Sequence, residues 1–379
     1  MINIIEKNKC CGCEACAQIC PQKCIQLLDD VEGYIYPYVN HELCINCGLC
    51  EQRCPLMKEH KPQIPIDSLG AVNNDECVVK SSSSGGIFSA LAGVIIKRGG
   101  VVFGASYNDI WAVEHILISD LKSLDRVRGS KYVQSRINNS YQNTYNFLQK
   151  GRKVLFSGTP CQIAGLKSFL RKEYDNLLTV EVACHGVPSP LVFKDYLDVV
   201  SKRNISNITS ISFRDKQKGW LNYRFVIKSK IKGKEKVIVN DERSNSMYLQ
   251  SFLRNYNLRP SCYQCVFKSG CSGADITLAD FWGVWKIVPN INYENGVSAV
   301  LVNTIKGRDF LNSIDIIKFT VNYNDVVKYN SCLKDSSREP ENRYLFWDYW
   351  QKRDYRRINK LVLPSIKTRI KRIIKQLFE

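Results

Sequence analysis

The chain has 379 residues, of which 44% are hydrophobic, and it carries 17 cysteines and a formal net charge of +18. This length allows two or three domains, and neither a signal peptide nor an apolar run of the ~20 residues that cross a bilayer is present, so we expect a cytoplasmic protein. An odd number of cysteines in a reducing compartment argues against disulfides and for metal or cluster ligation.

Two cysteine runs, Cys10–Pro21 and Cys44–Pro55, dominate the first 60 residues. Both have the spacing Cys-x2-Cys-x2-Cys-x3-Cys-Pro, by which bacterial two-cluster ferredoxins hold 4Fe–4S clusters, the fourth cysteine of each run serving the other cluster. We therefore expect one cluster at Cys10, Cys13, Cys16 and Cys54, and a second at Cys44, Cys47, Cys50 and Cys20. Structural zinc is the alternative, but zinc sites use paired Cys-x2-Cys units and do not need this run.

Residues 1–60 are predicted to form an α+β ferredoxin-like two-cluster domain, in which residues 31–40 link the half-repeats as a hairpin. Tyr34, Tyr36 and Tyr38 alternate there as on a strand, and they either shield a cluster or belong to the ordinary core. Prolines and mixed charge make residues 61–67 an extended linker. Residues 1–60 hold five basic and eight acidic side chains, so the positive charge lies on the rest of the chain.

The remaining chain is predicted to form a mixed α/β body, with regions 68–150 and 151–335. A serine run and Gly85-Gly86 lead into an apolar helix over Ile87–Arg98. From residue 152 the order strand, helix, strand, helix predicts a parallel βαβ unit. The expected elements there are strand 153–157, helix 161–171, strand 177–183 and helix 190–201. Other strands are expected at 101–107, 111–118, 210–214, 223–228, 236–240, 276–279 and 298–303.

A second group of cysteines lies in the body. Thr159 is a helix N-cap and Pro160 the first helical residue, so Cys161 lies in the first turn, where the helix dipole favours a thiolate. Cys184 ends the next strand, and both cysteines therefore lie at the carboxyl edge of the sheet, where α/β folds bind ligands. Downstream follow Cys262, Cys265 and Cys271. Four of the five could bind a third 4Fe–4S cluster; structural zinc or buried thiols are the alternatives.

Five segments of the body carry a family resemblance: SSSSGGIFSALA, RGSKYVQS, VLFSGTPCQIAGLKSFL, EVACHGVPSP and CYQC with ADITLADFWG. They resemble the coenzyme F420 hydrogenase/dehydrogenase beta-subunit family up to about residue 335, and residues 1–60 resemble the ferredoxin domain often fused to it. The resemblance implies an oxidoreductase that binds FAD and one 4Fe–4S cluster in this body. It assigns that cluster to Cys161, Cys184, Cys262 and Cys265, with Cys271 in reserve.

The FAD that the resemblance implies can be placed only by local pattern, because no GxGxxG or Walker motif is present. Ser84, Gly85 and Gly86 would offer bare amides to a phosphate at a helix N-terminus, or the serine loop only caps that helix. A second segment could hold the pyrophosphate or stack on the flavin: Ser130, Lys131 and Tyr132. Asp280 either contacts the cofactor or caps a turn. No catalytic residue is assigned.

Residues 336–379 form a basic tail, in which 364–378 is predicted to be a basic amphipathic helix. It either makes peripheral contact with an anionic membrane or packs on the body of its own chain.

The function expected from these features is an iron–sulfur flavoprotein oxidoreductase. It would move electrons between a reduced carrier (deazaflavin, NAD(P)H or ferredoxin), FAD and 4Fe–4S clusters, with a redox protein or soluble carrier as partner. The alternative is a non-catalytic electron-relay subunit of a larger redox complex. Nucleic acid is not an expected partner, because the chain has no recognition motif and its basic runs are not interleaved with aromatics.

Overall fold

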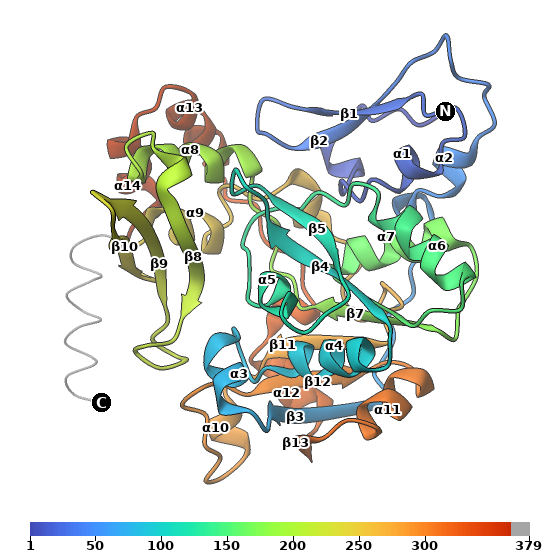
Figure 1. Ribbon diagram of the computed structural model, residues 1–379. Helices are drawn as coiled ribbons and strands as arrows, with labels where there is room; N and C mark the ends of the chain where they lie inside the picture. Colours follow the sequence, from blue (N-terminus) through green and yellow to red (C-terminus); the bar gives the residue numbers. More distant parts are fainter. Residues whose placement is uncertain (365–379) are drawn as a thin grey trace.

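The computed structural model describes residues 1–364, which form a small N-terminal lobe and a larger body (Figure 1). The lobe contains helix α1 (Ala15–Ile19), strands β1 (Ile25–Asp29) and β2 (Ile35–Val39), and helix α2 (Leu49–Gln52). The strands form an antiparallel hairpin, and α1 contacts α2, which brings the two cysteine runs together. The prediction of a ferredoxin-like lobe followed by a mixed α/β body is confirmed at this level.

An eight-stranded mixed sheet forms the centre of the body, in the order β13-β3-β12-β11-β7-β6-β4-β5. The four central strands β11, β7, β6 and β4 are parallel, and the outer pairs are antiparallel. The predicted βαβ unit is therefore present, with helix α7 joining β6 to β7. The strand bounds are β3 (Asp67–Asn73), β4 (Val101–Tyr107), β5 (Val113–Ile118), β6 (Val154–Gly158), β7 (Leu177–Val182), β11 (Ile276–Asp280), β12 (Ser298–Val302) and β13 (Ile316–Thr320).

Helices cover both faces of this sheet because its inner strands are apolar on both sides. Along β6, Leu155 belongs to one core with α4, α5 and α11, whereas Phe156 belongs to another with α6 and α7. The second core also contains Cys11 and Cys13, so the lobe sits on the side of the sheet that α6 and α7 cover. The helix bounds are α4 (Ile87–Lys97), α5 (Leu124–Val127), α6 (Ser140–Gln149), α7 (Pro160–Leu170) and α11 (Ile305–Asn312).

A separate three-stranded antiparallel sheet lies beside the central one, at the left of Figure 1. Its largely aromatic core is shared with α8, α9, α13 and α14, and Tyr34 and Tyr36 of the lobe belong to the same core. The bounds are β8 (Ile208–Asp215), β9 (Arg224–Ile231), β10 (Lys234–Glu242), α8 (Pro190–Val200), α9 (Met247–Leu253), α13 (Arg343–Gln351) and α14 (Tyr355–Val362). The shorter helices are α3 (Glu76–Ser81), α10 (Val284–Ile287) and α12 (Tyr323–Lys328).

Some features differ from the expectations. Strands β3 and β13 were not predicted, and β3 begins at Asp67, inside the expected linker. The boundary placed at residue 150 separates regions that share one sheet, because β3 and β4 lie in it with β6. The helix predicted over 364–378 falls essentially outside the described residues. Within residues 1–364, no helix has the length and apolar character needed to cross a membrane.

Candidate metal centres

One pocket of the lobe is lined by the four cysteines expected to hold the first cluster, which are Cys10, Cys13, Cys16 and Cys54. Cys11 lines the same pocket. Three come from the first cysteine run and one from the second. Burial raises the pKa of Cys16 well above its usual range, and the nearby Cys10 and Cys54 thiols raise it further. Thiolates in this pocket therefore need a cationic group between them, which the irons of a cluster would provide.

A second pocket of the lobe is lined by Cys20, Cys24, Cys44, Cys47 and Cys50. Four of them are the set expected for the second cluster, and Cys24 is an additional thiol. Ile2 N–H donates a hydrogen bond to Cys50 Sγ at 3.2 Å, the kind of contact that adjusts sulfur ligands. Cys47 is exposed, so this pocket lies at the surface of the lobe. Cys16 and Cys50 share one core, which makes the two pockets neighbours.

The third group forms where the carboxyl ends of β6 and β7 meet a 3-10 helix (Pro260–Gln264). It contains Cys161, Cys184, Cys262 and Cys265. Burial raises the pKa of the Cys184 thiol, and the Cys262, Cys161 and Cys265 thiols add to the effect, so these side chains are neighbours. Burial also raises the pKa of Cys262, to about 12. Burial raises the pKa of Cys271, and the Cys265 thiol raises it further, so Cys271 lies beside the group.

Two hydrogen bonds hold the downstream cysteines at the sheet edge. Arg259 N–H donates to Val187 O at 3.1 Å, and Val187 N–H donates to Cys262 Sγ at 3.4 Å. The segment after β7 is thus held against the segment before Cys262. Among residues 1–364, no three His, Cys, Asp or Glu side chains converge as the ligands of a single metal ion would.

Helix α7 begins as predicted. Thr159 is its N-cap, in a capping box with Gln162, and Pro160 is its first residue. The thiol chemistry at this point differs from the expectation. The neighbouring Cys11 thiol and burial raise the pKa of Cys161 well above its usual range, whereas the helix dipole alone was expected to favour the thiolate. A bound cation is therefore needed to hold Cys161 as a thiolate.

Two buried cations lie among these thiols, and neither was expected from the sequence. Lys268 Nζ donates to Cys184 O at 2.5 Å and to Cys332 O at 2.8 Å. Arg259 Nε donates to Cys10 O at 2.7 Å. Lys268 lowers the pKa of Cys184, against the larger effect of burial. Four sulfurs around each site, N–H···S contacts and buried cations suit 4Fe–4S clusters, whose thiolate-bound form carries net negative charge.

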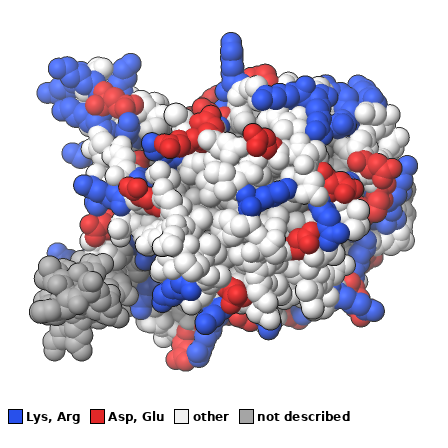
Figure 2. Space-filling view, turned by 90° about the horizontal axis from the view of Figure 1, so that it is seen from below, with Lys and Arg blue, Asp and Glu red and all other residues white. Residues whose placement is uncertain are grey.

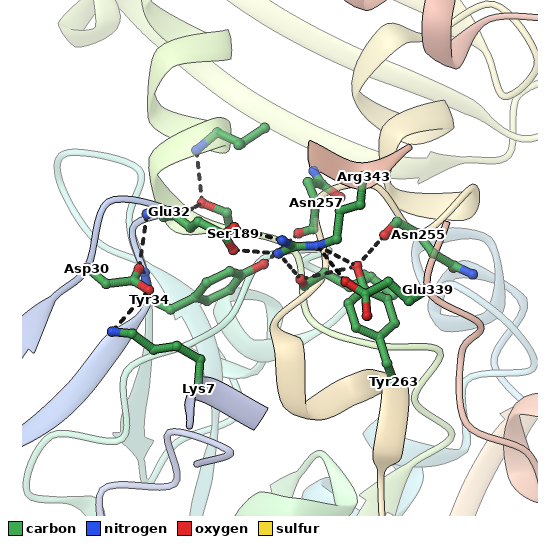
Figure 3. A network of polar contacts seen from close by, with 12 residues as sticks. Lys7, Asp30, Glu32, Tyr34, Ser189, Asn255, Asn257, Tyr263, Glu339 and Arg343 are labelled. Atoms are coloured by element: carbon green, nitrogen blue, oxygen red, sulfur yellow. Dashed lines mark hydrogen bonds and ion pairs between the residues drawn. The ribbon is translucent and has the colours of Figure 1, made fainter. Parts of the chain in front are cut away.

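A polar network fixes the lobe to the body (Figure 3). Glu32 of the hairpin pairs with Arg343 at the start of α13, and Arg343 Nη1 donates to Glu32 Oε1 at 2.7 Å. Beside this pair, Tyr34 Oη donates to Asn257 O at 2.6 Å. Tyr34 and Tyr36 are thus core residues at the junction of lobe and body, whereas Tyr38 is exposed.

The two segments expected to hold FAD lie side by side, and several of their donors have partners within the chain. Ser130 N–H donates to Ser83 Oγ at 2.8 Å, and Gly85 N–H donates to Ser298 Oγ at 3.0 Å. Ser84 Oγ donates to Val297 O at 2.8 Å. The amide of Gly85 is therefore not bare, as the sequence suggested.

The other residues of this region are also engaged. Lys131 Nζ donates to Arg128 O at 2.9 Å, and burial lowers the pKa of Lys131 to about 7. The Tyr132 ring stacks on Phe252 with centroids 4.8 Å apart. Asp280 does not simply cap a turn, because it pairs with the buried Arg214 at 2.8 Å.

Two family models match the chain. Residues 151–321 match the family described as the C terminus of the coenzyme F420 hydrogenase/dehydrogenase beta subunit. Residues 9–57 match the 4Fe-4S dicluster domain. The first match contains the third cysteine group up to Cys271, and the second contains both cysteine runs.

The chain is similar to two curated proteins of methanogens. It is 22% identical over 233 residues to the F subunit of the F(420)H(2) dehydrogenase of Methanosarcina mazei, covering 58% of this chain and 65% of that protein. It is 24% identical over 383 residues to the coenzyme F420-dependent sulfite reductase of Methanocaldococcus jannaschii, covering 94% of this chain and 54% of that protein. The chain thus spans between half and two thirds of these relatives. A solved chain from the F420-reducing NiFe hydrogenase complex of Methanosarcina barkeri aligns at 14% identity with a TM-score of 0.46, over 75% of this chain and 99% of that chain.

Proposed function

We propose that this chain transfers electrons between an external redox carrier and a partner protein, because residues 151–321 match the C terminus of the coenzyme F420 hydrogenase/dehydrogenase beta subunit and residues 9–57 match the 4Fe-4S dicluster domain. It is an iron–sulfur protein. The relatives named above are F420-dependent redox proteins, one of them a subunit of a dehydrogenase. The names of these relatives therefore support a redox partner for this chain.

A continuous row of cysteines from body to lobe surface carries the proposal. It begins at the third cysteine group and reaches Cys11, which lies next to both Cys161 and Cys13, since both thiols affect its pKa. The row continues through the first pocket to Cys16 and Cys50, which share a core, and ends at the exposed Cys47. When bound, 4Fe–4S clusters accept and release single electrons, and transfer needs them to be close neighbours.

The residues of the chain would divide the work as follows. The eight lobe cysteines expected to bind clusters hold two of them, and the third group holds one in the body: Cys161, Cys184, Cys262 and Cys265. Three of the four thiols of the first site are buried, and those of the third site are partly buried. Cys47 marks the exposed end, where a partner could approach.

The finer proposal is a flavoprotein that takes electrons from deazaflavin, NAD(P)H or ferredoxin through FAD near Ser84–Gly86 and Ser130–Tyr132. It is supported by the match of residues 151–321 to the beta-subunit family and by the position of the two segments, which lie side by side. FAD would be required only with a two-electron carrier, because a hydride carries two electrons and a cluster accepts one. In this structure the Gly85 amide and the Lys131 ammonium have partners within the chain.

The alternative, a non-catalytic electron-relay subunit, is favoured by these occupied donors. In that case the chain has no substrate of its own and receives single electrons from a partner. The two functions differ in flavin content and in reduction by hydride carriers.

Anaerobic purification with quantitation of iron, sulfide and flavin tests the proposal, followed by reduction with deazaflavin, NAD(P)H or reduced ferredoxin. About twelve irons per chain are expected for either function. One flavin together with reduction by a hydride carrier establishes the flavoprotein, whereas no flavin and reduction only by ferredoxin or dithionite establishes the relay. Colourless protein that contains zinc and gives no paramagnetic signal after dithionite would overturn both.

A further inference from the structure

Arg259 is the most unusual charged residue of the chain. It is 0% exposed and precedes the 3-10 helix that carries Cys262. Its guanidinium donates three hydrogen bonds, all to neutral oxygens. Nε donates to Cys10 O at 2.7 Å, Nη1 to Gln134 Oε1 at 3.0 Å, and Nη2 to Ile35 O at 2.8 Å.

The other buried arginine and a partly buried one at the junction of lobe and body have carboxylate partners. Arg214 pairs with Asp280, and Arg343 pairs with Glu32. Within the described residues 1–364, no ion pair of this kind forms at Arg259, whose raised pKa reflects thiol and phenol neighbours acting against burial. An uncompensated buried guanidinium is strongly destabilising, so a negative charge is needed nearby.

The groups around Arg259 show where that charge belongs. On one side its Nε reaches the carbonyl of Cys10, the first expected ligand of the first pocket. On the other side its backbone joins the body site. Cys262 N–H donates to Arg259 O at 2.9 Å, and Arg259 N–H donates to Val187 O at 3.1 Å, beside the Val187 N–H that donates to Cys262 Sγ at 3.4 Å. A Cβ at Gly12 would lie 2.7 Å from Nη1, so the cysteine loop packs directly on the guanidinium. Arg259 therefore stands between the first lobe site and the body site.

The aromatic neighbours complete the surroundings. The guanidinium lies 4.4 Å from the centroid of the Tyr36 ring and 5.4 Å from that of Tyr34. Rings give a cation partial compensation through their π faces but carry no net charge. They also exclude water, which strengthens any charge interaction across this junction.

We propose that Arg259 is a positioning residue that serves as the shared counter-cation of two 4Fe–4S clusters, one at Cys10/Cys13/Cys16/Cys54 and one at Cys161/Cys184/Cys262/Cys265. This inference rests on the proposed function. A cation near a cluster favours the reduced form, which is more negative by one charge, and so raises its midpoint potential. By acting on both clusters, Arg259 raises the midpoint potentials of both, and its hydrogen bonds fix the lobe loop at the body.

The test uses the full chain, purified anaerobically, with Arg259→Gln and Arg259→Lys compared in redox titrations followed by electron paramagnetic resonance. Arg259→Gln is expected to shift two of the three midpoint potentials to lower values, leaving the third unchanged. The cluster in the second pocket thus serves as an internal reference. Arg259→Lys retains the charge and is expected to stay close to the wild type.

Arg343→Gln is the matched control, because Arg343 also joins the body to the lobe but has its own carboxylate. It is expected to loosen the lobe without shifting any potential. Unchanged potentials in Arg259→Gln, or equal shifts in Arg343→Gln, would overturn the proposal. If Arg259→Gln does not retain its clusters, Arg259→Lys decides: loaded clusters with wild-type potentials support the charge, and their loss refutes it. Wild-type protein without clusters would instead refute the proposed function.

Discussion

At the scale of single residues, not every cysteine near a cluster site is expected to be a ligand. Each lobe pocket contains a cysteine that the motif does not use, Cys11 in the first and Cys24 in the second. Cys20 Sγ and Cys24 Sγ are 3.4 Å apart, so position alone does not distinguish them. Only the ferredoxin spacing does.

We predict that Cys20→Ala lowers the iron content by about four atoms per chain, because a cluster loses one of its four thiolates. Cys24→Ala, its matched control, should retain the wild-type iron content and spectrum. Iron and sulfide assays on both variants measure this. The reverse pattern would mean that Cys24 is the ligand.

His115 gives a second prediction at this scale, on the pH dependence of stability. It is buried, its Nε2 donates to Ser157 O at 2.9 Å, and its Nδ1 accepts from Ser135 Oγ at 3.1 Å. Burial lowers its pKa from 6.5 to about 4. The unfolded chain therefore takes up a proton first as the pH falls, so stability is full above pH 6.5 and is lost progressively down to about pH 4.

The lowered pKa of His115 therefore reduces the free energy of unfolding by about 2 kcal/mol at about pH 5, compared with its value above pH 6.5. We expect His115→Gln to show a smaller loss of apparent melting temperature between about pH 7.5 and about pH 5 than the wild type, by a few degrees. Comparing the two proteins cancels the acid sensitivity of other groups. Parallel curves would show that the pKa of His115 is the same in the folded and unfolded chain.

At the scale of elements, helix α7 links the sheet to the lobe. Gly165 lies in its middle, and a Cβ there would meet Tyr141 Oη at 2.8 Å and Cys13 Cβ at 2.9 Å. Gly93 in α4 has helical backbone as well, but the nearest atom, Leu121 Cδ2, lies 3.9 Å from its Cβ position. The two glycines thus separate helix propensity from close packing.

Replacing glycine by alanine inside a helix stabilises it by up to about 1 kcal/mol where space allows. We predict that Gly93→Ala raises the melting temperature, whereas Gly165→Ala displaces the cysteine loop and speeds hydrogen exchange over residues 10–20. Thermal unfolding and hydrogen exchange measure the two effects. Unchanged exchange in Gly165→Ala would show that the lobe does not depend on this contact.

The elements also show how far the sequence alone leads. Strands β4, β6, β7 and β11 and helix α7 were predictable, because apolar runs, turn residues and the Thr159-Pro160 cap act locally. Strand β3 was not, since Asp67–Asn73 is only partly apolar and is held by β12 and β13, which come more than 200 residues later. Arg259 was missed for the same reason, because its partners Cys10, Ile35 and Gln134 are distant in sequence.

The cysteines behave differently. Their spacing alone groups the eight lobe residues, because a cluster imposes its geometry on a short loop. Local pattern also assigned the two flavin segments to one cofactor. Their hydrogen-bonding state could not, since Gly85 and Ser84 are engaged by Ser298 at the start of β12 and by Val297 just before it.

At the scale of the whole molecule, several contacts hold the lobe on the body. Arg259 donates a hydrogen bond to Cys10 O in the first cysteine loop. Glu14 accepts hydrogen bonds from Ile137 N–H at 2.7 Å and from Asn138 N–H at 3.1 Å. Glu32 and Arg343 close the far end (Figure 3). Because these contacts surround the first pocket and leave the second open, the lobe presents one buried and one exposed site. That arrangement suits electron transfer from a site fixed against the body to a site that a partner can reach.

Charge is distributed unevenly over the molecule. Figure 2 shows charged side chains mainly toward the rim of one face, whose middle is largely uncharged. By sequence, residues 365–379 add Lys367, Arg369, Lys371, Arg372 and Lys375 with a single acidic residue, Glu379. If this segment provides the peripheral membrane contact, its binding should depend on anionic lipid and on salt.

A truncation that tests this contact should begin after Pro364. Trp350, Ile358 and Val362 are buried, and Trp350 Nε1 donates to Asp195 at 3.0 Å, so removal of residues 350–364 would damage the body. We predict that the full chain sediments with phosphatidylserine vesicles at low salt and much less at about 0.5 M salt, and that the chain ending at residue 364 does not. Changing the five basic residues of the tail to glutamine is the matched control, which keeps its apolar side chains and should also abolish binding. Equal sedimentation of the full and truncated chains would place any membrane contact elsewhere on the basic body.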